Sequence, residues 1–434
     1  MDLLSSIVKK RIQPLGNATK SNWQGLLPVR IAFFTLGPLF SIIVPILTLP
    51  AISTNFGHSG WASIAVGQSL GIAAAIVIEL GWTVAGPLQV ARADHNGQAS
   101  AFRRSLLERG CVSLLSLPVV GVLIQLVNPD YDLEAFLTAT AMALGGMSAA
   151  WFYVGTGASL KMLLMDSLPR VATSVGGAVM LMNGAPLIAL PLTQLTASVF
   201  LPFVPLFWLP RVQRQDKSLG LRSELAFTWK AQGAAFVTRV ASSAYVALPT
   251  ALMASVAPVA QVASYAAVDR VGRTALAALS PFNLALQGWI PAADGHERRR
   301  RMYIALWLSS VLAILSFIAF WLLAPWVIGF LFAGEILPDN TAIFSFSLAV
   351  GAVVLSRCTG IQCLAVLGKT WTTASSTVVG LLISVPMVLV LGAAYGAVGV
   401  AWAIATTELS VLGVQVVALL AMAKSRRSIQ RKKL

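Results

Sequence analysis

Residues 302–323 read MYIALWLSSVLAILSFIAFWLL, an uncharged block that directly follows the basic run Arg298–Arg301. At about 1.5 Å of rise per residue, a helix of this length spans about 33 Å, close to the hydrocarbon thickness of a bilayer. Similar blocks recur along the whole chain of 434 residues, in which 57% of residues are hydrophobic and only 11% are charged. Soluble domains have about 25% charged residues. The composition excludes a soluble globular protein and predicts an all-α, multispanning membrane protein.

The apolar blocks and the breaks between them predict twelve transmembrane helices. Because twelve is even, both chain ends lie on the same side of the membrane. The predicted helices cover residues 29–52, 61–84, 110–127, 135–160, 171–190, 192–210, 232–256, 263–290, 302–323, 341–367, 372–393 and 397–423.

The basic residues are distributed unevenly between the two sets of predicted loops. The loops on the side of the termini, in which Arg109 is counted, hold 27 of the 31 lysines and arginines. The opposite loops hold none and carry acidic residues instead, among them Asp130, Glu134 and Glu335. Since cytoplasmic loops are enriched in Lys and Arg, this asymmetry predicts cytoplasmic termini. The net charge of +15 therefore reflects orientation in the membrane, and no nucleic-acid partner is expected.

The chain is predicted to consist of two six-helix halves. An offset of 201 residues aligns Gly71 with Gly272 and the small-residue stretches that surround them. Six helices per half gives both halves the same orientation, with a substrate path expected between them. The predicted segments are a basic cytoplasmic N-terminal segment (1–28), an N-terminal six-helix bundle (29–210), a cytoplasmic linker (211–231), a C-terminal six-helix bundle (232–423) and a basic cytoplasmic tail (424–434).

Four arginines lie inside the predicted helices, namely Arg239, Arg270, Arg273 and Arg357. A charge near the bilayer centre costs at least about 2.5–3.5 kcal/mol, so each arginine needs a partner, water or a ligand. Guanidinium groups bind phosphate oxygens bidentately, so an anionic ligand would supply such a partner. Pairing with acidic residues on other helices is the alternative.

Three acidic residues also lie in predicted helices, namely Glu79, Asp269 and Glu408. Asp269 precedes Arg273 by four residues, the favourable spacing for a helical ion pair, so a structural role for Arg273 stays open. Arg270 points about 100° away from Asp269 around the helix and is freer to face a cavity. Glu408 lies near mid-span, where a carboxyl group can carry a coupling proton or neutralise an arginine.

Four short stretches carry a resemblance to a known family. In these stretches, and in helix number and loop charge, the chain resembles the polysaccharide (Wzx-type) flippases of the superfamily that also contains multidrug and toxin extruders and lipid II flippases. The stretches are Asn55-Phe56-Gly57 with Gly60, Glu79-Leu80-Gly81-Trp82, Trp151-Phe152-Tyr153-Val154-Gly155 with Arg170, and Tyr265 to Arg270 with Ser280-Pro281.

The resemblance implies an alternating-access transporter that flips a polyprenyl-pyrophosphate-linked oligosaccharide across the bacterial cytoplasmic membrane. It implies membrane lipids and polysaccharide-assembly enzymes as partners, and no cofactor beyond a coupling ion, H⁺ or Na⁺. The four intramembrane arginines would hold the pyrophosphate or an acidic sugar. Trp151 and Tyr153 would stack on sugar rings, with packing inside the membrane helix as the alternative.

Two other functions within the superfamily stay open, and an enzyme is not expected. A multidrug extruder often carries an acidic residue in its first helix, and this chain has none there. A lipid II flippase usually has more than twelve helices. Gly368-Lys369-Thr370 lacks the first glycine of a phosphate-binding loop, because Cys363 stands in its place. The three histidines lie in separate loops without metal-ligand spacing.

Overall fold

The computed structural model describes residues 20–210, 246–290 and 294–431, and it confirms the predicted all-α class. Within these ranges every regular element is helical and no strand occurs. The N-terminal half contains α2 (Lys20–Glu79), α3 (Trp82–Arg92), α4 (His95–Val127), α5 (Asp132–Leu144), η1 (Gly145–Met147), α6 (Ala150–Thr156), α7 (Ser159–Met162), η2 (Leu163–Ser167), α8 (Leu168–Met182), α9 (Ala189–Phe200) and η3 (Leu201–Phe207). The C-terminal half contains α11 (Pro249–Ala254), α12 (Val259–Ala278), α13 (Ser280–Trp289), α14 (Gly295–Leu331), α15 (Asn340–Arg357), η4 (Cys358–Leu364) and α16 (Thr370–Arg431).

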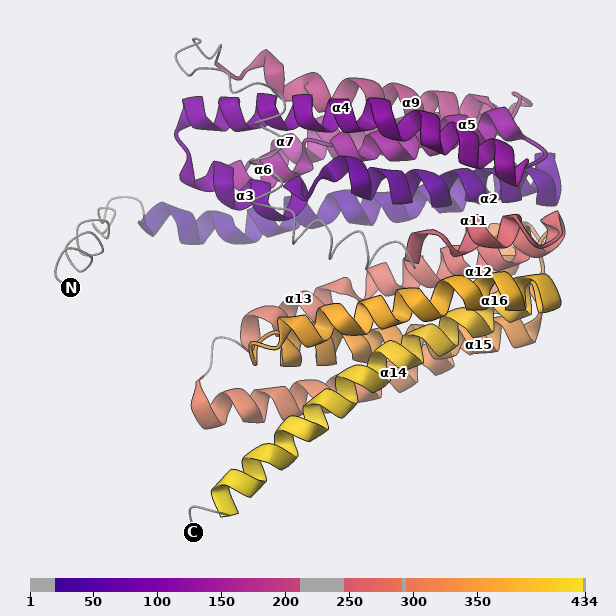
Figure 1. Cartoon of the computed structure of the whole chain (residues 1–434). Helices are drawn as coiled ribbons and strands as arrows, with labels where there is room; N and C mark the ends of the chain where they lie inside the picture. The colour runs from indigo at the N-terminus through magenta and orange to yellow at the C-terminus, as the bar shows by residue number, and fades with distance from the viewer. Residues whose placement is uncertain (1–19, 211–245, 291–293, 432–434) are drawn as a thin grey trace.

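The two longest elements, α2 and α16, each fold back on themselves at a glycine. A straight helix of 60 residues would be about 90 Å long, three times the thickness of the hydrocarbon core. Gly57 in α2 and Gly396 in α16 have φ angles of 58° and 57°, in the left-handed region that favours glycine. Each glycine therefore ends one helix and starts the next, which runs back alongside the first (Figure 1).

Seven helices in the described ranges are long and apolar enough to cross a membrane, and two of them, Val44–Glu79 and Trp371–Met422, contain these glycine turns. The predicted block 232–256 begins outside the described residues. A multispanning membrane protein is therefore established, while the count of twelve spans and the division into the predicted segments stay predictions.

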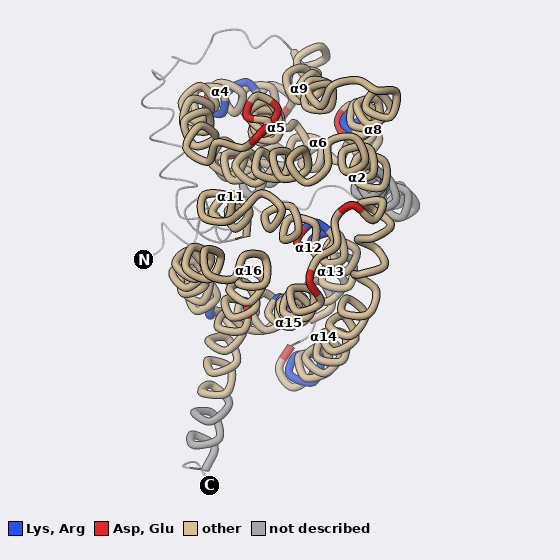
Figure 2. The backbone as a smooth tube through the Cα atoms, turned by 90° about the vertical axis from the view of Figure 1, so that its right-hand side faces the viewer, with Lys and Arg blue, Asp and Glu red and all other residues tan. Residues whose placement is uncertain are grey.

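The helices form two groups that meet along a seam (Figures 1 and 2). On one side of the seam lies α2, which contacts α11, α12 and α14 on the other. The turns at Gly57, between α4 and α5, between α14 and α15, and at Gly396 all lie at one end of the molecule, at the right in Figure 1. We call this the Gly57 end. It carries the loops that were predicted to face away from the cytoplasm.

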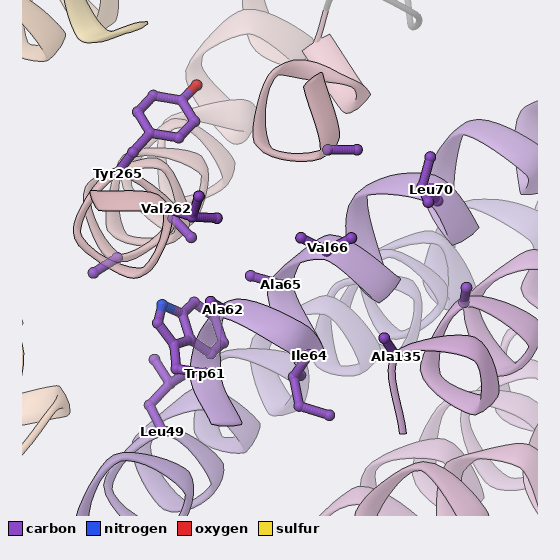
Figure 3. Close-up of a cluster of buried hydrophobic side chains, with 14 of the residues drawn as sticks. Leu49, Trp61, Ala62, Ile64, Ala65, Val66, Leu70, Ala135, Val262 and Tyr265 are labelled. Carbon is purple, nitrogen blue, oxygen red and sulfur yellow. The ribbon is translucent and has the colours of Figure 1, made fainter. Parts of the chain in front are cut away.

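Near the Gly57 end, side chains of α2 bind directly to the C-terminal half. The indole of Trp61 reaches from α2 towards α12 beside Val262 (Figure 3), and its Nε1 donates a hydrogen bond of 3.1 Å to the carbonyl of Ala263. Its ring meets that of Phe332 edge-on at 5.2 Å. Ser53 Oγ donates to the Phe332 carbonyl at 3.0 Å. These contacts hold the two halves together at this end.

Close helix packing repeats between the two halves. A Cβ atom on Gly71 would stand 2.5 Å from the Ala139 carbonyl oxygen of α5, and one on Gly272 would stand 2.3 Å from the Phe346 ring of α15. The two glycines aligned in the sequence thus press α2 and α12 against equivalent helices of their own halves.

The structure corrects the prediction that Arg109 lies in a loop. Asp94 caps α4 by accepting a 2.8 Å hydrogen bond from the Gly97 amide, so the helix begins well before the apolar block. Arg109 is consequently helical and fully buried. Its Nη1 donates to the carbonyls of Gly146 and Ser148 at 3.1 and 2.9 Å, where the chain breaks between α5 and α6. The arginine therefore binds backbone carbonyl groups that the break between α5 and α6 leaves without helical partners, and it does not lie in a cytoplasmic loop.

Candidate substrate-binding site

One helix, α12, carries three of the charged residues singled out in the sequence. Asp269 and Arg273 form an ion pair with 2.6 Å between Oδ2 and Nε, one helical turn apart. Arg273 also donates a hydrogen bond to the Val246 carbonyl next to α11. Arg270 follows Asp269 directly, so the two side chains leave the helix about 100° apart around its axis.

A pocket with an empty volume of about 360 Å³ lies on the seam, and we call it the seam pocket. Its two walls differ in chemistry. The α2 wall is neutral and includes Trp61, Gln68 and Ser69, whereas the α12 wall is charged and includes Asp269, Arg270 and Arg273. In the described part of the chain, the buried Nε of Arg270 has no hydrogen-bond partner. Because burying an unpaired charged donor is costly, this guanidinium is suited to an anionic ligand.

A second pocket, with an empty volume of about 790 Å³, lies inside the C-terminal half, and we call it the C-terminal pocket. Its apolar wall includes Phe346 and Val350 of α15. Arg357 donates a 3.3 Å hydrogen bond from Nη1 to the Leu276 carbonyl at the edge of this pocket. The polar lining consists of Tyr265, Asp269, Arg273, Ser356, Arg357 and Glu408.

The two pockets share the Asp269–Arg273 ion pair, which lies in the wall of both. Together the pockets are lined by three arginines and two carboxylates, so their formal charge is positive by one. An anion with several oxygen acceptors could engage more than one guanidinium here, since each offers a planar fork of donors.

The other charged candidates lie elsewhere. Arg239 falls outside the described residues. Glu79 ends α2 and accepts a 3.0 Å hydrogen bond from the Thr83 hydroxyl, and it does not line either of the two pockets. Of the residues singled out in the sequence, the structure therefore gathers Asp269, Arg270, Arg273, Arg357 and Glu408. Whether these residues bind substrate stays a prediction.

The two aromatic candidates lie inside the N-terminal half. Trp151 and Tyr153 are 2% and 1% exposed. The Trp151 ring lies 5.0 Å from that of Trp82 and 6.2 Å from that of Phe102, and it does not line either pocket. In this conformation their surroundings are those of packed side chains, and their contact with sugar stays a prediction.

The sequence analysis did not select several polar residues of the pockets, among them Gln68 and Tyr265. Gln68 stands in an otherwise small and apolar stretch of α2 and lines the seam pocket. Tyr265 is 1% exposed, its hydroxyl is without a partner in the described structure, and it lines the C-terminal pocket. An uncharged polar side chain within a predicted membrane helix was the available signal for Gln68.

Comparison with known proteins gives matches in structure alone. The sequence matches no family model and no curated protein. The fold is similar to that of lipid II flippase MurJ in an inward closed conformation, with a TM-score of 0.61 at 13% identity, covering 89% of this chain and 87% of that one. It is also similar to the inward-facing conformation of a multidrug resistance MATE family transporter of the MOP superfamily, with a TM-score of 0.59 at 14% identity, covering 93% and 98%. The outward-facing conformation of a MATE family transporter matches with a TM-score of 0.52 at 14% identity, covering 94% and 96%.

These matches define the class of the molecule. The chain is a multispanning, all-α membrane protein with the fold of the MOP-superfamily transporters. Multidrug transporters and a lipid II flippase share this fold, so the fold alone does not choose between the two functions.

Proposed function

We propose that this protein is an alternating-access transporter that flips a polyprenyl-pyrophosphate-linked oligosaccharide across the bacterial cytoplasmic membrane, with both termini cytoplasmic. The observation that carries the proposal is the excess of arginine over carboxylate in the two pockets around α12. A site for an organic cation would instead be expected to carry a net negative charge. A pyrophosphate carries the negative charge and the oxygen acceptors that Arg270, Arg273 and Arg357 can bind.

The position of the seam supports alternating access. Direct hydrogen bonds across the seam join α2 to α12 and to the end of α14 close to Gly57. The match to the inward-facing MATE transporter is better than the match to the outward-facing one, with TM-scores of 0.59 and 0.52. We infer a conformation closed at the Gly57 end, which the loop charges assign to the outside.

Within this proposal the seam pocket holds the polar part of the substrate. Arg270 binds the pyrophosphate at the seam, and the neutral wall of Gln68 and Ser69 faces the sugars. The lipid tail stays in the bilayer. Glu408 or Asp269 carries the coupling ion, H⁺ or Na⁺, because an acidic group beside arginines can exchange its partner for a cation. Membrane lipids and polysaccharide-assembly enzymes are the proposed partners.

The test is a deletion strain complemented with variants. Undecaprenyl-linked oligosaccharide should accumulate on the cytoplasmic face, and surface polysaccharide should disappear. Arg270→Ala and Arg357→Ala should each reduce export about 10-fold or more, since a hydrogen bond to a charged group contributes about 1.5–3 kcal/mol. Arg300→Ala is the control, because its side chain is 68% exposed.

Other outcomes would select the alternatives. Raised drug sensitivity with normal surface polysaccharide would indicate a multidrug extruder. Accumulation of lipid II with lysis would indicate a lipid II flippase. Wild-type export by the Arg270→Ala/Arg357→Ala double variant would contradict the proposed role of the pockets.

A further inference from the structure

Cys358 and Cys363 lie in η4, the π-helical segment that continues α15 directly after Arg357. In a π-helix the backbone hydrogen bonds join residues five apart, so side chains at that spacing lie near one face. In an α-helix the same two side chains would be rotated by about 140° from each other. Both cysteines are fully buried, and they belong to one small hydrophobic cluster. The π-helix therefore creates a buried dithiol.

A third sulfur-bearing residue, Met302 of α14, belongs to the same cluster as the dithiol. This cluster is separate from the main hydrophobic core. Ser309 lies seven residues further along α14, on the same face of the helix. The Ser309 hydroxyl is fully buried and has no hydrogen-bond partner in the described part of the chain. The cluster thus gathers three side chains with soft sulfur donors.

We propose that Cys358, Cys363 and Met302 form a binding site for a soft monovalent cation, Cu⁺. Thiolate and thioether sulfurs are soft ligands that select Cu⁺ over hard cations, which prefer oxygen. On binding, one thiol releases its proton to solvent and forms a copper–thiolate bond, and no electron is transferred. The single thiolate neutralises the ion, while the second thiol and the thioether donate as neutral ligands. A neutral occupied site suits the apolar surroundings.

Binding would fix the helix register beside the C-terminal pocket. A metal that joins residues 358 and 363 stabilises the π-helix and opposes a return to the α-helical register. Arg357, which lines the C-terminal pocket, directly precedes this segment. Control of Arg357 by copper rests on the proposed function, whereas copper binding itself does not.

The test measures Cu⁺ binding to the full-length protein in lipid nanodiscs. Cu⁺ is kept reduced with ascorbate and buffered with bathocuproine disulfonate, and Cys111→Ser is the matched control because Cys111 lies in α4 and is not part of this cluster. We expect one Cu⁺ per chain in the wild type and in Cys111→Ser. Cys358→Ser and Cys363→Ser should each lower the affinity about 100-fold or more, and Met302→Leu about 10-fold.

The inference would be overturned by absence of binding in the wild type, or by unchanged affinity in both serine variants. If those variants do not fold, phenylarsine oxide on the wild type provides an independent measurement. The arsenical forms two As–S bonds and releases its oxygen as water with the two thiol protons, which requires both thiols on one face. One tightly bound arsenical per chain, removable by a dithiol but not by a monothiol, is the expected result. No binding would exclude the dithiol. Neither measurement depends on transport, so failure here is distinguishable from failure of the proposed function.

Discussion

Replacing Trp61 by phenylalanine should open the Gly57 end more often. The indole of Trp61 donates one hydrogen bond across the seam, to the Ala263 carbonyl at the start of α12. Phenylalanine keeps an aromatic ring that can still meet Phe332 edge-on, and it removes this donor. The variant thus removes a contact that exists only while α2 and α12 are together.

The size of the effect follows from the contacts that are lost. A buried hydrogen bond contributes about 1 kcal/mol net, so the ratio of open to closed molecules should rise about 5-fold. Adding Ser53→Ala removes the hydrogen bond to the Phe332 carbonyl. In the double variant the ratio of open to closed molecules would rise about 30-fold if the two free-energy losses add. Both side chains contact Phe332, so we expect the two losses to be coupled.

Distances between spin labels across the seam measure this ratio. His58 in the N-terminal half and Leu337 in the C-terminal half line one pocket at the Gly57 end and are exposed. In a cysteine-free background, labels at these two positions should give a short distance when this end is closed and a longer one when it is open. The fraction at the longer distance should increase in Trp61→Phe.

The matched control is Trp307→Phe, since Trp307 on α14 is 66% exposed and lies away from the seam contacts. It should leave the distance distribution unchanged. An unchanged distribution in folded Trp61→Phe would refute the argument that this hydrogen bond favours closure. A shift towards shorter distances would refute it as well.

Three further predictions concern stability, each measured by unfolding of the purified protein. Gly71→Ala should destabilise the protein by about 1–3 kcal/mol, because its Cβ would meet a carbonyl of α5 at 2.5 Å, whereas Gly176→Ala, with no atom within 4 Å, should fit without a clash. Arg109→Met should lower stability by about 3 kcal/mol or more, since two carbonyls at the break between α5 and α6 lose a charged donor. Asp339 caps α15, and hydrogen bonds from Thr341 hold the pKa of its carboxyl group below the usual value. The charged cap therefore stabilises the fold above the usual carboxyl pKa, and that contribution is lost as the pH falls through the lowered pKa. Asp339→Ala should lower the free energy of unfolding by about 1 kcal/mol at pH 7. Below about pH 4 the difference in this free energy between variant and wild type should be smaller.

Much of the fold follows from apolar block length and from glycine. The long blocks predicted membrane helices, and the break after Asn55-Phe56-Gly57 coincides with a left-handed glycine. The start of α4 could not be found in this way. Apolar content marks the part of a helix inside the bilayer, whereas the N-cap Asp94 sets where the helix begins. For this reason Arg109 was assigned to a loop although it is buried in the helix.

Only the charged residues of the candidate site could be predicted from the sequence. A charged side chain inside an apolar block is visible in a sequence, and four-residue spacing predicts the ion pair of Asp269 with Arg273 that the structure contains. Which other helices face that pair depends on tertiary packing. Gln68 lines the seam pocket from the opposite half. No local sequence pattern predicts that Asp269 and Arg273 line both pockets.

Closure of the seam and the charge of the seam pocket involve the same face of α12. Ala263, whose carbonyl accepts the Trp61 hydrogen bond, and Arg270 are seven residues apart, so they lie on one face about 10 Å from each other along the axis. Trp61 itself lines the pocket that Arg270 enters. A movement that separates α2 from α12 must therefore break the Trp61 contact and divide the seam pocket between its two walls. An anion bound to Arg270 and to the polar wall of α2 would oppose that separation, so its release and the opening of the Gly57 end are expected to be thermodynamically linked.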